Sequence, residues 1–275
     1  MPEGPEIRRA RDDIAAAIEG KSATRVIFFQ PALAQWNGSF DGEKILMVRN
    51  RGKAMLTDFA NGYSIYSHNQ LYGRWSVVEP GETPGGNRQL RLAIHTADKS
   101  ALLYSASDIE VWPTTELHSH PFLKKLGPDV LQESTVAEEI RQRLLSATWR
   151  GRQLGGFLTH QSFVAGLGNY LRCEILFAAG LHPRQRPREL SREQCKLLAE
   201  KILALPRQSY ETGGITNDLH RAEELMQAGR SFEAARFQVF RREGEPCYRC
   251  GATILLEKHG GQACYLCPAC QGLAS

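Results

Sequence analysis

The first residues of the chain combine a proline with two carboxylates in a pattern that could do carbonyl chemistry. The sequence opens Met1-Pro2-Glu3-Gly4-Pro5-Glu6, and removal of Met1 would leave a secondary amine at Pro2. An α-amino group has a pKa of about 7.7–8.0, so roughly a tenth of it is unprotonated at neutral pH. Such an amine can attack an aldehyde, and a secondary amine then stops at an iminium ion that favours elimination. The simpler interpretation is that Pro2 and Pro5 only begin a helix.

Four of the seven cysteines have the spacing of a structural zinc site. They form two C-x-x-C pairs separated by sixteen residues: Cys247, Cys250, Cys267 and Cys270. Four thiolates complete a tetrahedral shell and leave no open position, so the sequence predicts one structural zinc ion in a hairpin. Two disulfides are the alternative, and they fit poorly with a chain that shows no secretion signal. Cys264 is expected on the hairpin, and Cys173 and Cys195 are expected to be buried thiols on helices.

The elements that must position these residues change in type along the chain. Residues 3–19 place apolar side chains at helical spacing and predict an amphipathic helix that ends at Gly20. Short β-rich runs follow, punctuated by Gly, Asn, Asp and Pro, and predict an antiparallel sandwich. The runs are 24–29, 44–48, 54–59, 63–66, 75–78, 89–95 and 101–104.

The second half of the chain reads as helical. Thr135 and Glu138 have the spacing of a capping box, and Ser191 is expected to begin a helix that runs through Leu203. The run Gly166-Leu167-Gly168-Asn169 predicts a tight turn into a helix at 170–179, with Asn169 as its N-cap. Exposed N–H groups at such a helix start can bind phosphate, although an ordinary packing corner is the alternative.

Length and composition set the outer limits. The 275 residues favour more than one domain, and the turns place the boundaries at 1–127, 128–235 and 236–275. Residues 211–235 are expected to be a mobile connector before the cysteine hairpin. Lys and Arg number 34 against 30 Asp and Glu, and this net charge of +4 favours an anionic partner only weakly. No apolar run is long enough to span a bilayer, so we expect a cytoplasmic protein.

Taken in order along the chain, these motifs resemble the formamidopyrimidine-DNA glycosylase and endonuclease VIII family. The resemblance covers the whole chain and depends on five signatures. They are Pro2-Glu3-Gly4-Pro5-Glu6, Arg51-Gly52-Lys53, Ser67-His68-Asn69-Gln70-Leu71-Tyr72-Gly73, Gly166-Leu167-Gly168-Asn169-Tyr170-Leu171 and the cysteine quartet. The fold implied is α+β: an N-terminal helix and β-sandwich domain, then a helical domain with a helix-two-turn-helix motif and a four-cysteine zinc hairpin.

The resemblance implies a catalytic role for the first residues. Pro2 would attack the sugar C1′ as the damaged base leaves, and elimination would then break the 3′ and the 5′ phosphate bonds. Glu3 matches the family's general acid/base, and Glu6, one turn along the helix, would orient the amine or relay protons. Lys53 matches the family's active-site lysine, which contacts the phosphate near the lesion.

The remaining matches imply contacts with damaged double-stranded DNA by a monomeric, nucleoid-associated protein. His68 and Asn169 match phosphate contacts, which position the DNA rather than specify its sequence. Gln70-Leu71-Tyr72 resembles the contiguous wedge of the endonuclease VIII branch, which fills the gap left by an extruded base. The other branch has a methionine in place of Leu71, so we expect oxidised pyrimidines rather than 8-oxoguanine or formamidopyrimidines as substrates.

One position departs from the family pattern. Five residues before the third cysteine the family has an arginine that grips a phosphate, and this chain has Gln262. A neutral amide cannot supply a charged bidentate contact. Lys258 or His259 could take over the phosphate. The competing hypothesis of a non-catalytic damaged-DNA-binding protein gains support from Gln262 alone, whereas Pro2, Glu3 and Lys53 favour an enzyme.

Overall fold

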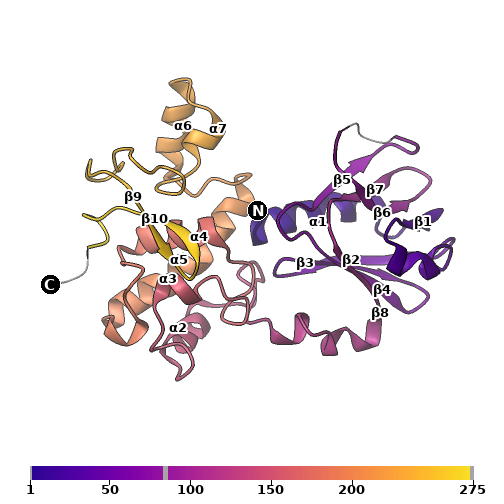
Figure 1. The fold of residues 1–275 in the computed structure, drawn as a ribbon, viewed down its shortest axis with the longest axis horizontal. Helices are drawn as coiled ribbons and strands as arrows, with labels where there is room; N and C mark the ends of the chain where they lie inside the picture. The colour runs from indigo at the N-terminus through magenta and orange to yellow at the C-terminus, as the bar shows by residue number, and fades with distance from the viewer. Residues whose placement is uncertain (1, 83–85, 273–275) are drawn as a thin grey trace. The chain divides into compact units, whose positions relative to one another are not determined.

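The chain folds into two compact units. The computed structural model describes residues 2–82 and 86–272. Unit 1 contains Pro2 and residues 6–125, and unit 2 contains residues 3–5 and 126–272 (Figure 1). Within these described residues, every helix is too short or too polar to cross a lipid bilayer.

Unit 1 is a β-sandwich with one long helix, as the sequence predicts. The helix is α1 (Gly4–Ile18). Two four-stranded antiparallel sheets have the strand orders β1-β6-β7-β5 and β2-β3-β4-β8. The strands are β1 (Arg25–Phe28), β2 (Ile45–Arg51), β3 (Ala54–Phe59), β4 (Tyr63–His68), β5 (Arg74–Val78), β6 (Leu90–His95), β7 (Ser100–Tyr104) and β8 (Asp108–Pro113). Short 3₁₀ helices lie at Pro31–Trp36, Thr114–Ser119 and Leu123–Lys125.

The core of unit 1 joins both sheets to the apolar stripe of α1. Ile7 and Ile14 of α1 are 1% exposed and belong to one apolar cluster with residues from each sheet. The strand β8 is absent from the predicted set. Its sequence, Asp-Ile-Glu-Val-Trp-Pro, alternates polar and apolar residues as a half-buried strand does, but its acidic residues and its final proline are uncommon in strands.

Unit 2 is helical and ends in a two-stranded hairpin. Its helices are α2 (Ala137–Leu145), α3 (Leu154–Phe157), α4 (Asn169–Ala179), α5 (Arg192–Glu211), α6 (Leu219–Gln227) and α7 (Phe232–Ala235), with a 3₁₀ turn at Pro187–Glu189. The antiparallel hairpin consists of β9 (Leu255–His259) and β10 (Gln262–Leu266). In Figure 1 the orange helices α6 and α7 occupy the chain between α5 and the yellow hairpin.

The structure corrects three local predictions in unit 2. The N-cap of α2 is Val136 without a side-chain hydrogen bond, so the predicted Thr135–Glu138 capping box is wrong. The capping box at Ser191 is confirmed, and its helix extends beyond Leu203 to Glu211. The expected mobile connector 211–235 is instead largely helical, because Asp218 and Ser231 cap two further helices that the mixed polarity of the segment conceals.

Helix α4 is the central element of unit 2. It ends at Gly180, whose φ of 66° lies in the left-handed region that glycine adopts without strain. Two of its residues are charged, and both Arg172 and Glu174 are fully buried. The carboxylate of Glu174 accepts hydrogen bonds from the N–H groups of residues 238–240 at 2.8–2.9 Å and from the Thr216 hydroxyl at 2.9 Å. Glu174 therefore fixes the segment that leads from α7 into the cysteine hairpin.

Loss of this carboxylate should destabilise unit 2. In the Glu174→Ala variant three N–H groups, two of them on buried residues, lose their acceptor, at a cost of about 3 kcal/mol in the free energy of unfolding. Hydrogen exchange of the α4 amides, followed by mass spectrometry, measures this change locally. Glu200→Ala on the exposed face of α5 is the matched control and should change that free energy by less than about 1 kcal/mol. Equal protection of α4 in the two variants would contradict the structural role of Glu174.

Candidate active site

The carboxylate of Glu3 lies at the amino end of α4. Glu3 is 2% exposed. Its oxygens accept hydrogen bonds from the N–H groups of Gly168 at 2.7 Å, Tyr170 at 2.8 Å and Leu171 at 3.4 Å. A carboxylate in this place satisfies N–H groups that have no partner within the helix and interacts favourably with the helix dipole. These three N–H groups are therefore committed to Glu3, and the expectation that they offer a free phosphate site is wrong.

Glycines make room for this contact. A Cβ on Gly168 would lie 2.3 Å from the carboxyl carbon of Glu3, so no other residue fits there without displacing the carboxylate. Gly166 has a φ of 100°, which few other residues adopt. Its carbonyl accepts a hydrogen bond from the Gly4 N–H at 2.8 Å. The Gly-Leu-Gly-Asn turn thus holds both the backbone and the side chain of the N-terminal segment.

Asn169 is the first residue of α4 rather than its predicted N-cap, which is Gly168. The Asn169 side-chain oxygen accepts a hydrogen bond from Arg172 at 2.5 Å. Since the amide oxygen is occupied, the NH₂ group is the part of the side chain that faces other partners. This orientation agrees with the predicted phosphate contact, because an anion requires a donor.

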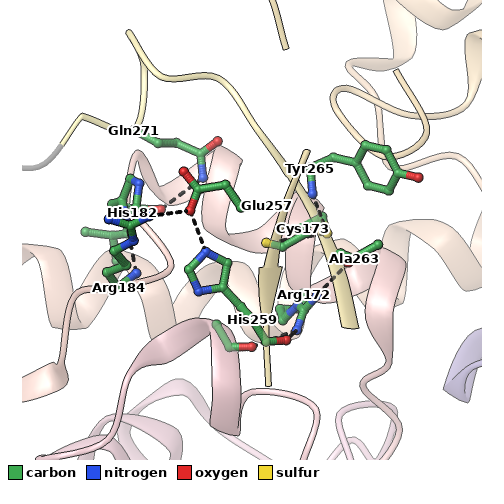
Figure 2. Close-up of polar contacts among 12 residues, drawn as sticks. Arg172, Cys173, His182, Arg184, Glu257, His259, Ala263, Tyr265 and Gln271 are labelled. Atoms are coloured by element: carbon green, nitrogen blue, oxygen red, sulfur yellow. Dashed lines mark hydrogen bonds and ion pairs between the residues drawn. The ribbon is translucent and has the colours of Figure 1, made fainter. Parts of the chain in front are cut away.

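The guanidinium of Arg172 connects α4 with the tip of the hairpin. Besides Asn169, it donates to the backbone oxygens of Gly155 at 2.7 Å, His259 at 3.0 Å and Ala263 at 2.8 Å. Figure 2 shows Arg172 between the two strands of the hairpin and α4. Arg172 is absent from the site residues predicted from the sequence. Its signal in the sequence is an arginine three positions after Asn169 in a mostly apolar helix, because a buried charge must have partners.

Unit 1 places Lys53 and His68 near each other. Gly52 and Lys53 form the two-residue loop between β2 and β3, and Gly52 has a φ of 57°, the left-handed region used by primed hairpin turns. Ala54 pairs with His68 across the sheet, so Lys53 lies beside the end of β4. Burial and the charge of Lys53 lower the pKa of His68 to about 4. His68 is therefore neutral at physiological pH.

The tautomer of His68 follows from its hydrogen bond. The Nδ1 atom accepts from the Gln70 N–H at 3.0 Å, so in the neutral ring Nε2 carries the proton. A neutral imidazole with an N–H group can donate to a phosphate. The predicted phosphate contact by His68 is thus chemically possible without protonation.

The predicted wedge is an exposed loop with a fixed backbone. Leu71 and Tyr72 are 59% and 70% exposed. Gln70 has a φ of 50°, and its side-chain oxygen accepts a hydrogen bond from Ser107 at 2.7 Å. A Cβ on Gly73 would lie 2.5 Å from the carbonyl oxygen of Asn69, so the turn closes as tightly as glycine allows. Both side chains are therefore accessible to a partner.

Pro2 and Glu6 complete the N-terminal set. Pro2 is partly exposed and precedes Glu3 directly in the chain. Glu6, in the first turn of α1, forms an ion pair with Arg9 at 3.1 Å. Glu6 is thus a half-buried first-turn carboxylate, and its predicted assistance to the amine remains a prediction.

Gln262 begins β10, directly after the two-glycine loop at the hairpin tip. Its side-chain oxygen is buried without a hydrogen-bond partner among the described residues. His259 is 7% exposed, and its Nε2 contacts the Glu257 carboxylate at 2.9 Å, so this imidazole is committed to the hairpin. Lys258 is exposed, so of the two residues proposed to replace the family arginine at the phosphate, it is the one open to solvent.

The predicted cysteine quartet is brought together. The sulfur atoms of Cys247, Cys250, Cys267 and Cys270 all lie within 4.8 Å of one another, and three of the pairs are 3.4–3.9 Å apart. Thiolates at about 2.3 Å from a tetrahedral zinc ion would be about 3.8 Å apart, so the quartet fits that ion. The Gln271 amide accepts from the Cys267 N–H and donates to the Leu181 carbonyl, both at 2.9 Å. It thereby ties the second knuckle to the segment after α4.

Comparisons with known proteins agree with this geometry. Residues 1–107 match the formamidopyrimidine-DNA glycosylase N-terminal domain, and residues 126–220 match the H2TH domain of the same family. Proteins named endonuclease 8 from Enterobacter sp. (strain 638) and Klebsiella pneumoniae are 47% and 46% identical, over 98% of this chain and 100% of theirs. Lactococcus lactis Fpg in complex with DNA containing an abasic site has a TM-score of 0.81 at 23% identity, over 98% of this chain and 100% of that one.

The chain therefore belongs to the formamidopyrimidine-DNA glycosylase family. The family match and the full-length relatives define a DNA glycosylase/AP lyase of base excision repair. The predicted α+β fold is confirmed by the family domains and by the likeness to the solved structure.

A single methyl group added at position 168 should displace the Glu3 carboxylate from its hydrogen bonds. In the Gly168→Ala variant the new Cβ overlaps the carboxyl group, so either Glu3 or the start of α4 must shift, at a cost of about 1–3 kcal/mol in the free energy of unfolding. We expect a lower melting temperature and a loss of strand cleavage that is larger than the destabilisation alone would cause. Gly151→Ala is the control, because no heavy atom lies within 4 Å of its added Cβ. Wild-type activity in Gly168→Ala would show that catalysis does not depend on this contact.

Proposed function

We propose that the protein excises oxidised pyrimidines from damaged double-stranded DNA and then nicks the strand by β,δ-elimination. It would act as a monomer in the cytoplasm, with Pro2 as its nucleophile. The observation that carries this proposal is the burial of Glu3 at the start of α4. Pro2 precedes Glu3 directly in the chain, so the proposed nucleophile is one residue away from this contact.

The chemistry assigned to the first two residues follows from their functional groups. After removal of Met1 the Pro2 nitrogen attacks C1′ of the damaged nucleotide, and the C1′–base bond breaks. The amine loses its proton, the sugar ring opens, and the resulting iminium draws electrons from the neighbouring carbon. Loss of the 3′ phosphate and then of the 5′ phosphate completes the two eliminations. Glu3 acts as the general acid/base of ring opening.

Charged and polar groups of both units support a role in holding the phosphate backbone. Lys53 supplies a cation beside the neutral Nε2–H donor of His68 in unit 1. Asn169 in unit 2 presents its NH₂ group because Arg172 occupies its oxygen. Contacts of these kinds position a duplex without reading its sequence.

The exposed wedge supports base extrusion as the recognition step. Removing a nucleotide from the stack costs a few kcal/mol, and apolar side chains inserted in its place recover part of this cost. Leu71 and Tyr72 are exposed and adjacent, as such insertion requires. The preference for pyrimidine lesions depends on Leu71 at the position where the purine-lesion branch has methionine.

We assign one structural zinc ion to the cysteine quartet. Cys247, Cys250, Cys267 and Cys270 would hold it, and no position would remain for substrate or water. When bound, the ion would supply folding energy for the hairpin rather than chemistry at the sugar.

The metal assignment predicts one zinc per chain. Treatment with a strong chelator should unfold the hairpin and weaken DNA binding, and should leave the β-sheet signal of unit 1 in circular dichroism unchanged. Metal analysis of the purified protein measures the stoichiometry directly. Absence of zinc, or its retention in a Cys267→Ser variant, would overturn the ligand set.

The nucleophile can be trapped. Borohydride added during turnover reduces an iminium to a stable amine, so we expect a protein–DNA adduct whose cross-linked peptide begins at Pro2. Peptide mapping by mass spectrometry locates the bond, and mass spectrometry of the intact chain shows whether Met1 has been removed. A cross-link at Lys53 would refute the assignment of Pro2.

Glu3→Gln should separate the two activities. The substitution keeps the amine but replaces the acid/base carboxylate by an amide, so base excision should fall steeply. Strands that already contain an abasic site should still be cut, because the amine can attack the open aldehyde. Parallel rate measurements on the two substrates decide the matter, and equal losses on both would count against the proposed role.

Gln262→Arg tests the departure at the hairpin tip. If this position faces a phosphate, an arginine adds a charge-assisted hydrogen bond worth about 1.5–3 kcal/mol before the cost of ordering its side chain. Affinity for damaged duplex should rise, and its dependence on salt should steepen by about one counterion. Lys258→Ala in the same salt series shows whether Lys258 already supplies the contact. Unchanged affinity and slope in Gln262→Arg would mean that position 262 does not face the backbone.

A further inference from the structure

Two cysteines outside the quartet lie against each other inside unit 2. Cys173 on α4 and Cys264 on β10 are 0% and 1% exposed, and their Sγ atoms are 3.9 Å apart. The third remaining thiol, Cys195 on α5, has a different environment, because its Sγ contacts the Pro187 carbonyl at 3.7 Å. The pair at 173 and 264 therefore has a chemical possibility that Cys195 lacks.

The backbones on either side hold these two sulfur atoms in register. Arg172 donates to the Ala263 carbonyl at 2.8 Å, and the Tyr265 N–H donates to the Cys173 sulfur at 3.4 Å. Figure 2 shows both contacts between α4 and β10. Residues directly before and after Cys264 are thus tied to Cys173 and its neighbour. A disulfide needs its sulfur atoms at about 2.05 Å, so the two sulfurs must approach each other from 3.9 Å, which requires local movement of the hairpin against α4.

We infer that Cys173 and Cys264 form an oxidation site, at which a reversible disulfide fastens the cysteine hairpin to α4. With hydrogen peroxide as oxidant, one thiol attacks a peroxide oxygen and becomes a sulfenic acid as one water leaves. The sulfur of the second thiol then attacks the sulfenic sulfur, and the S–O bond breaks with loss of a second water. Two thiols are oxidised by two electrons, and one peroxide is reduced to two waters.

Burial determines when this reaction takes place. Neither thiol is open to solvent in the folded hairpin, and buried cysteines are inert while their surroundings stay closed. The quartet is what closes the hairpin when it holds a metal, so oxidation of the pair should be slow in metal-loaded protein and fast after chelation. The bond would then keep β10 on α4 across a separation of 91 residues when the knuckles have lost their ion.

Peptide mapping tests this site independently of DNA chemistry. Full-length protein is treated with hydrogen peroxide before and after removal of metal by a chelator, and free thiols are then alkylated. Trypsin followed by chymotrypsin, which cuts after Tyr265, separates Cys264 from the quartet cysteines. We expect a linked peptide pair containing Cys173 and Cys264 in the chelated sample, lighter by two hydrogens and abolished by dithiothreitol.

A second measurement asks whether the bond holds the hairpin. Because a disulfide across a long loop stabilises the folded state, oxidised wild type without metal should lose residues 247–272 to protease at least about tenfold more slowly than its own dithiothreitol-reduced form. Cys173→Ser and Cys264→Ser should each remove this protection, and Cys195→Ser should retain it. The comparison of oxidised and reduced wild type needs no substitution, so a misfolded variant cannot decide the result.

Two outcomes would overturn the inference. In the first, Cys173 and Cys264 are recovered alkylated while the quartet cysteines are linked among themselves. In the second, the linked peptide forms but oxidised and reduced wild type are digested at equal rates. Metal analysis of the same samples reports on the quartet, so failure of the zinc assignment is distinguished from failure of the disulfide.

Discussion

The buried carboxylate of Glu3 is the contact that fixes the N-terminal segment to the start of α4. Three N–H groups at the start of α4 stabilise its charge, and a glycine at 168 leaves the space for it. Glu3, the residue next to the proposed nucleophile Pro2, is therefore held by the N–H groups and the dipole of α4 rather than by contacts within α1. The glycine motif at residues 166–169 and the carboxylate of Glu3 thus form one contact, although 165 residues separate Glu3 from Gly168 in the chain.

A second buried charge extends this order to the hairpin. Arg172 lies three residues beyond Asn169 and binds the oxygens of three separate segments, including both strands of the hairpin. Glu174 does the same for the segment that enters the hairpin. Both charges are inaccessible to water, so their hydrogen bonds are specific in geometry and costly to lose. Helix α4 thus contains Asn169 and is hydrogen-bonded both to Glu3 and to the hairpin that contains Gln262.

Much of the fold was predictable because its signals are local. Helical spacing in residues 3–19, alternation in the strands and C-x-x-C pairs each need only a few neighbouring residues. The hydrogen bonds of Glu3 were not predictable, because the Gly168 partner lies 165 residues away. The glycines around it were also compatible with an ordinary turn between packed helices. Helices α6 and α7 were missed although their signals are local. Their capping residues were visible in the sequence, but mixed polarity and two glycines concealed the periodicity.

The shape of the wedge loop affects the thermodynamics of any encounter with DNA. Gln70 sits in a left-handed conformation and is held by its neighbours, and Gly73 closes the turn against Asn69. The loop therefore already has its backbone ordered before a partner arrives. Ordering a flexible loop upon association costs free energy for every residue fixed, and this loop pays most of that cost during folding. Free energy gained when Leu71 and Tyr72 leave water remains available to offset the unstacking of a damaged base.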